Sequence, residues 1–369
     1  MSRETQKNEC ATKNLPSAGE VLSLGLEAVS AGKLQEAVRF FDLAVHLDPE
    51  YAEAYNCRGL VLMELGRLED AFASLEKAIG LAADSAKYWY SKSLLFRRLG
   101  MHEDEAQACM KALKIDPKYT MAWYGRARAL SKMGDIDEAI SCLEKSIELE
   151  PFNPDMWYHR GTCESMLGDH ERAGRSFDRA IEINPEHARA WCGKGDGMAA
   201  AGDREGSLQC FRRACGIDPA LPEAWYGRGR IMLAQEQHEE ALQAFDRAVE
   251  SFPDWPEVWL YRGWALEMLA RAGDALESYA RAIEIDPGNP VAWCMQGILL
   301  GKMGIGDRAI ECFGRAIAIR PDFVEAWYRK GLLLGIMGRR EDASACISRA
   351  VELDPGIMEL IRDGLSKGT

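Results

Sequence analysis

Residues 157–185 read WYHRGTCESMLGDHERAGRSFDRAIEINP, and variants of this stretch recur along most of the chain. The recurrence is plainest in its last residue, because a proline stands at a spacing of 34 residues, with alanine in one slot. The slots are Pro49, Ala83, Pro117, Pro151, Pro185, Pro219, Pro253, Pro287, Pro321 and Pro355. A fixed period of this length predicts a repeat protein, in which each repeat buries its apolar face against its neighbours.

The first half of each repeat has an aromatic residue followed four positions later by a small one, as in Trp157 and Gly161. Residues four apart lie on one face of an α-helix, so this pair predicts a helix that a neighbour can approach closely. The aromatic place is filled by Tyr55, Trp89, Trp123, Trp157, Trp191, Trp225, Trp259, Trp293 and Trp327, and by Val21 in the first repeat. Because most of the tryptophans recur at this place, we interpret them as structural.

The second half of each repeat predicts a second helix. Ala173, Phe177 and Ala180 share one helical face, with small residues that permit close packing and an aromatic ring that fills the groove beside them. Between the halves stands a glycine such as Gly168, which suits the positive φ that ends many helices. Each repeat is therefore predicted to form two antiparallel helices.

This pattern closely resembles the tetratricopeptide repeat, whose consensus is nearly matched by Trp-Tyr-His-Arg-Gly, Gly-Asp-His-Glu-Arg-Ala and Phe-Asp-Arg-Ala-Ile-Glu-Ile-Asn-Pro within residues 157–185. The resemblance implies an all-α fold, a right-handed superhelix of stacked antiparallel helix pairs whose first helices line the concave side. We expect ten repeats over residues 18–357, a polar tail over residues 1–17 and a capping helix over residues 358–369.

Composition excludes several classes of function. The 369-residue chain has a net charge of −13 and a pI near 5.1, which argues against non-specific binding to nucleic acid or to an acidic membrane. We find no apolar run long enough for a membrane span and no secretory signal at the N-terminus. The 11 scattered cysteines are typical of a reducing compartment, so we expect a cytoplasmic protein.

Motifs that carry chemistry are missing from the sequence. It has no Cys-x-x-Cys, no His-x-x-x-His, no phosphate-binding loop and no nucleophile elbow. The carboxylates fall mainly at predicted helix starts and on exposed faces, where they favour the helix dipole. We therefore expect no catalytic residue, no bound metal and no cofactor.

The resemblance places binding specificity on the first-helix face. Repeats 3 and 4 put a basic and aromatic cluster there, within an acidic chain, and such a cluster is suited to a carboxylate- or phosphate-bearing partner. Its predicted contact residues are Lys87, Tyr90, Arg97, Arg98, Lys118, Tyr124, Arg128 and Lys132.

Repeats 7 and 8 instead place acidic and aromatic residues on this face: Glu223, Tyr226, Arg230, Trp255, Glu257, Trp264 and Glu267. Trp255 and Trp264 are the two tryptophans outside the structural place. The two clusters together predict a groove, basic in one part and acidic in another, that orients a partner segment by charge. The alternative for each cluster is a solvated face, because tyrosine and arginine also recur at equivalent places in other repeats.

We predict from these observations a non-catalytic scaffold that binds a protein partner, as a peptide segment or a domain, in the groove. Two alternatives stay open. One is single-stranded nucleic-acid binding through the basic and aromatic cluster of repeats 3 and 4. The other is a structural protein that self-assembles through its end repeats.

Overall fold

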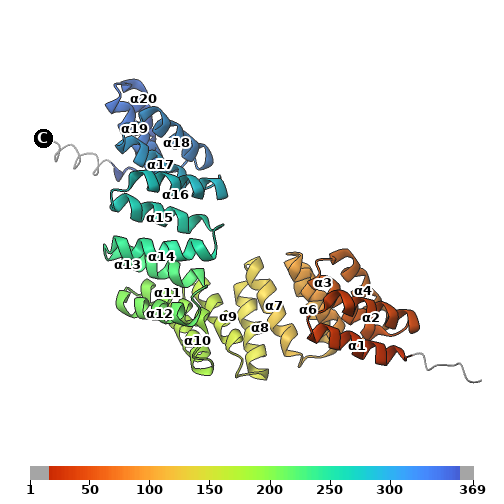
Figure 1. Cartoon of the computed structure of the whole chain (residues 1–369). Helices are drawn as coiled ribbons and strands as arrows, with labels where there is room; N and C mark the ends of the chain where they lie inside the picture. Colours follow the sequence, from red (N-terminus) through yellow and green to blue (C-terminus); the bar gives the residue numbers. More distant parts are fainter. Residues whose placement is uncertain (1–15, 358–369) are drawn as a thin grey trace, which may run out of the picture. The chain divides into compact units, whose positions relative to one another are not determined.

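The computed structural model describes residues 16–357, whose regular secondary structure is entirely α-helical (Figure 1). Most of the predicted polar tail (residues 1–15) and the predicted capping helix (residues 358–369) lie outside the described residues. The helices are α1 (Ala18–Ser30), α2 (Leu34–Leu47), α3 (Ala52–Glu64), α4 (Leu68–Leu81), α5 (Ala86–Arg98), α6 (His102–Ile115), α7 (Thr120–Met133), α8 (Ile136–Leu149), α9 (Pro154–Met166), α10 (His170–Ile183), α11 (Ala188–Ala200), α12 (Arg204–Ile217), α13 (Pro222–Ala234), α14 (His238–Ser251), α15 (Pro256–Met268), α16 (Ala272–Ile285), α17 (Pro290–Lys302), α18 (Gly306–Ile319), α19 (Val324–Ile336) and α20 (Arg340–Leu353).

The helices form two compact units, an N-terminal unit that ends at Pro185 and a C-terminal unit that begins at Glu186. Within each unit every odd-numbered helix packs along the even-numbered helix that follows it, and successive pairs stack on one another. The predicted all-α fold of stacked antiparallel helix pairs is confirmed. The 34-residue period continues unchanged past Pro185, so the sequence gives no sign that the chain divides into two units there.

The recurring tryptophan is tethered by a hydrogen bond that its spacing alone does not reveal. The indole N–H of Trp157 donates to the backbone carbonyl of Pro151 at 2.9 Å. Equivalent bonds join Trp123 to Pro117, Trp225 to Pro219, Trp259 to Pro253, Trp293 to Pro287 and Trp327 to Pro321. Trp89 donates in the same way to the carbonyl of Ala83 at 3.0 Å. Since the acceptor is a backbone group, alanine in the proline slot keeps the tether.

In most repeats the small residue of the first helix is required by an aromatic ring of the second. A Cβ on Gly229 would lie 2.6 Å from Cε1 of Phe245, a fully buried ring. The same close approach joins Gly25 to Phe41, Gly161 to Phe177, Gly263 to Tyr279 and Gly297 to Phe313. Repeat 3 has Ser93 at this place, and there the residue 16 positions later is the smaller Cys109. Helix separation in each pair is therefore set jointly by the two residues.

Eight glycines adopt a positive φ just after a first helix or at its end, as the sequence predicts. Repeats 7 and 8 lack this glycine, yet the backbone keeps the same conformation at Glu236 (φ 61°) and Ala270 (φ 57°). A Cβ in the left-handed region costs roughly 1–2 kcal/mol. These two turns are therefore held in place by the packing of the helices that they join.

Replacement of Gly229 by alanine should destabilise the C-terminal unit by about 1–3 kcal/mol, because the new methyl group overlaps the Phe245 ring. Urea unfolding monitored by circular dichroism measures the change. The double variant Gly229→Ala/Phe245→Leu should recover part of the loss. Gly197→Ala is the control, because nothing lies within 4 Å of a Cβ there and alanine favours the helix; an equal loss in both single variants would contradict the proposed overlap.

Replacement of Ala270 by glycine should stabilise the C-terminal unit by up to about 1 kcal/mol, because glycine adopts a positive φ without steric cost. Thermal unfolding measures the shift. Ala201→Gly provides a comparison of opposite sign, since Ala201 has a φ of −76° at the end of α11 and gains nothing from glycine. A lower melting temperature for Ala270→Gly would contradict the assignment of strain to this turn.

Candidate functional site

A pocket of about 550 Å³ lies in the N-terminal unit, where α5, α7 and α9 contribute first-helix side chains and α6 and α8 contribute others. The charged, histidine and tyrosine side chains that line it are Arg97, His102, Glu105, Arg128, Lys132, Tyr158 and His159. Ala127, Leu143 and Cys163 also line it and are almost fully buried, so they form its apolar floor. We call this site the basic pocket.

The basic pocket contains a buried carboxylate. Glu105 is 3% exposed and occupies a place where most repeats have alanine. Its Oε2 lies 3.5 Å from Nδ1 of His102, and its Oε1 lies 3.8 Å from a guanidinium nitrogen of Arg128. Burial raises the pKa of Glu105, because desolvation disfavours its charged form more than Arg128 and His102 favour it. Glu105 thus holds Arg128 in place and offsets part of its charge.

The two tyrosines of the predicted cluster, Tyr90 and Tyr124, are not among the residues that line the basic pocket, although Tyr124 lies beside Arg128. The Arg128 guanidinium lies 6.0 Å from the ring centroid of Tyr124, which in turn meets His159 edge-on at 5.3 Å. Tyr90 meets Tyr119 edge-on, also at 5.3 Å. Burial raises the pKa of Tyr124 to about 12 and also raises that of Tyr90. Both rings are therefore engaged and partly enclosed.

The structure brings together some of the predicted cations and separates others. Those that line the basic pocket are Arg97, Arg128 and Lys132. Lys87 instead places its Nζ 2.7 Å from Glu53, and this hydrogen bond raises the pKa of Lys87. Arg98 is exposed at the end of α5, outside the pocket lining. Lys118 is exposed in the turn before α7, also outside the lining.

Sequence reasoning missed several residues of the pocket, among them His102, His159 and Thr162. His159 and Thr162 lie on the first-helix face of repeat 5, next to the region that the prediction selected, so extending the cluster by one repeat would have found them. His102 begins a second helix, and no register argument places it beside first-helix residues.

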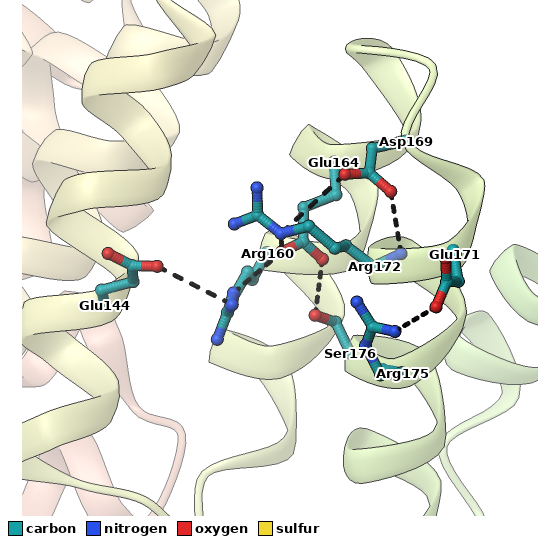
Figure 2. A network of polar contacts seen from close by, with 8 residues as sticks. All are labelled: Glu144, Arg160, Glu164, Asp169, Glu171, Arg172, Arg175 and Ser176. Carbon is teal, nitrogen blue, oxygen red and sulfur yellow. Dashed lines mark hydrogen bonds and ion pairs between the residues drawn. The ribbon is translucent and has the colours of Figure 1, made fainter.

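A polar network fixes α9, which forms one wall of the pocket (Figure 2). Glu164, almost fully buried, accepts hydrogen bonds from Arg160 at 3.0 Å and from the Ser176 hydroxyl at 2.6 Å. Arg172 lies 3.5 Å from the same carboxylate, and Arg160 also reaches Glu144 of α8 at 3.7 Å. The network joins α9 to α8 and α10, so these carboxylates have a structural role.

In the C-terminal unit the predicted acidic and aromatic residues have different environments. Glu267 is only 8% exposed at its side chain, accepts a hydrogen bond from the Tyr279 hydroxyl at 3.0 Å and lies 2.6 Å from Nζ of Lys302. Its carboxylate is thus engaged within the chain. Glu223 and Glu257 are exposed. The remaining predicted residues, Tyr226, Arg230, Trp255 and Trp264, lie in or beside one row of aromatic rings.

Within residues 16–357 we find no group of three or more His, Cys, Asp or Glu side chains placed to hold a metal ion. None of α1–α20 is long and apolar enough to cross a membrane.

Comparison with sequence families identifies the repeat. One family model described as "Tetratricopeptide repeat" matches residues 22–86, 124–188, 167–222, 194–256 and 226–290. A second model of the same description matches residues 86–119 and 324–357. Among curated proteins, none matches the chain.

Solved structures of similar fold agree with this result. A tetratricopeptide repeat protein from Parabacteroides merdae is 18% identical, with a TM-score of 0.57 over 68% of this chain and 98% of that one. PilF of Pseudomonas aeruginosa is 18% identical, with a TM-score of 0.52 over 58% and 97%. The Cut9–Hcn1 hetero-tetramer of APC/C provides a chain 14% identical, with a TM-score of 0.56 over 92% and 74%. At these identities the likeness concerns the fold alone.

Replacement of Glu105 by glutamine should raise the free energy of unfolding at neutral pH by up to about 1–2 kcal/mol, a typical range for a buried polar change. The pKa of Glu105 is raised in the folded chain, so its ionisation costs stability as pH rises above the unfolded value. The gain should therefore vanish in acid, where both side chains are neutral. Urea unfolding across this pH range measures the difference.

Glu103→Gln is the matched control, because Glu103 lies exposed on the same helix. It should leave stability nearly unchanged at every pH. A loss of stability in Glu105→Gln at neutral pH would mean that the contacts with Arg128 and His102 outweigh the desolvation of the carboxylate.

Proposed function

Because this chain belongs to the tetratricopeptide repeat family, we propose that it is a non-catalytic protein-interaction scaffold whose basic pocket binds a peptide segment of a partner. The observation that carries the proposal is the arrangement of Arg97, Arg128 and Lys132 around one pocket with an apolar floor. A concave site that combines charged groups with a buried apolar surface is typical of peptide recognition.

The chemistry of the lining specifies the segment. Three cations against the single carboxylate of Glu105 leave the pocket positive in a chain whose net charge is −13. Hydrogen bonds between arginine or lysine and a carboxylate are stronger than those between neutral groups. Ala127, Leu143 and Cys163 favour an apolar side chain next to that carboxylate. The preferred segment therefore combines an acidic residue with an apolar one.

The arrangement of the tyrosine rings in this region does not favour single-stranded nucleic acid. Binding of that kind needs aromatic faces on which bases stack. Tyr90 and Tyr124 are instead half-buried and engaged edge-on with Tyr119 and His159. A buried carboxylate, Glu105, also lies among the cations that would meet phosphates. We therefore restrict the proposal to a protein partner.

Selection of dodecapeptides from a random phage-displayed library on the intact chain tests the proposal. We expect one class of selected peptides to be rich in Asp and Glu beside an apolar residue. As synthetic fluorescein-labelled peptides, their affinity should fall about tenfold or more in Arg97→Glu/Lys132→Glu, a loss of at least 1.4 kcal/mol. Fluorescence anisotropy measures the dissociation constants.

The matched control is Arg98→Glu/Lys114→Glu, which reverses the same amount of charge on exposed residues of α5 and α6 outside the pocket lining. It should change the affinity much less. Equal losses in both double variants would mean that overall charge, and not the basic pocket, attracts the peptides. Selection that yields no acidic class would contradict the proposed site.

A further inference from the structure

Four aromatic side chains of the C-terminal unit form a continuous row. The Tyr226 ring lies 4.8 Å from Trp255 and 5.5 Å from Tyr261, measured between ring centroids, and Tyr261 lies 6.0 Å from Trp264. We call these four residues the aromatic row. Trp255 and Trp264 do not occupy the place at which the structural tryptophans donate to a turn carbonyl. The tether that explains the recurring tryptophans therefore does not explain these two.

One end of the aromatic row opens into an apolar pocket. Leu260, Tyr261 and Trp264 of α15 line it together with Val291 and Met295 of α17, and its volume is about 230 Å³. Trp264 is 42% exposed and Val291 37%, so apolar surface faces solvent here. The pocket is smaller than most small-molecule sites, which measure about 300–1,000 Å³. It has the size for one apolar side chain of a larger partner.

The other end of the row has a second opening, of about 490 Å³, lined in part by Glu223, Phe252 and Trp255. Arg189 lines the same opening as Glu223, and Glu257 follows Trp255 by two residues. Among residues 16–357, Glu223 and Glu257 have no ion pair or side-chain hydrogen bond. Other carboxylates nearby are engaged: Asp254 with Arg281 and Glu267 with Lys302.

The cations beside the row, Arg189 and Arg230, form no ion pair with Glu223 or Glu257 among the described residues. Arg230 lies over the Tyr226 ring, with 5.5 Å between its guanidinium carbon and the ring centroid. Desolvation of the ring hydroxyl is the largest cause of the rise in the pKa of Tyr226 to about 12. Arg230 lowers this pKa, and Glu257 raises it. This contact between Arg230 and Tyr226 is a cation–π interaction, the same kind that a cation of a bound segment would make with the exposed rings.

We propose that the aromatic row and its two exposed carboxylates bind a peptide segment in which an apolar side chain is flanked by lysine or arginine. The apolar side chain enters the pocket between α15 and α17, and the cations lie near Glu223, Glu257 and the ring faces. The segment has the opposite charge preference to the one expected at the basic pocket. This inference rests on the proposed peptide-binding function and assigns it a second, independent site.

The phage selection on the intact chain tests this inference separately, because it should return a second class of dodecapeptides, rich in Lys and Arg around an apolar residue. Their affinity, measured by fluorescence anisotropy, should fall about tenfold or more in Trp264→Ala. It should fall several-fold in Glu223→Gln/Glu257→Gln and become less sensitive to salt, because the charge attraction is lost. Arg97→Glu/Lys132→Glu should leave it unchanged.

Glu205→Gln/Glu239→Gln is the matched control for charge, since both residues are exposed on second helices of the same unit. It should have little effect on the basic peptides. Absence of a basic class, or basic peptides whose affinity survives Trp264→Ala, would overturn the inference. Loss of the acidic class alone would count against the basic pocket and leave the aromatic row standing.

Discussion

In repeats 1, 5, 6, 7, 8 and 9, contact between a glycine of the first helix and an aromatic ring of the second determines how closely the helix pair packs. At Gly229 and Phe245 the ring approaches so closely that no Cβ fits between them. This brings the two helix axes together and buries the ring completely. Stacking of pairs then depends on a constant pair thickness, because each repeat is covered only by its neighbours. The surfaces available for binding follow from that regular stack.

The tethered tryptophan extends this constraint to the connection between repeats. Its indole N–H binds the backbone carbonyl six residues earlier, so the turn before each first helix is held to that helix. Alanine can replace proline in the slot at Ala83 because the acceptor is not a side chain. Pair packing and turn tether together account for most of the recurring residues. The residues that differ between repeats are then the ones free to specify binding.

Prediction from sequence succeeded where a side chain has one role repeated many times, and was incomplete where a contact joins different repeats or different helices. The helix pairs, the positive-φ glycines and the structural tryptophans follow from periodicity. Arg97 and Arg98 are neighbours in the sequence but about 100° apart around α5, and only Arg97 lines the basic pocket. The sequence offered no sign that Glu267 would be engaged by Lys302, 35 residues further on.

Buried carboxylates distinguish the two surfaces in a way that composition cannot. In the basic pocket Glu105 lies 3.8 Å from Arg128, which orients the guanidinium without making a close hydrogen bond to it. In the proposed binding mode a ligand carboxylate can therefore still gain hydrogen bonds from Arg128, while Glu105 offsets part of the positive charge. At the aromatic row Glu267 is used internally, whereas Glu223 and Glu257 stay exposed. In the proposed binding modes, charges that are already paired position each surface, and unpaired charges give it its selectivity.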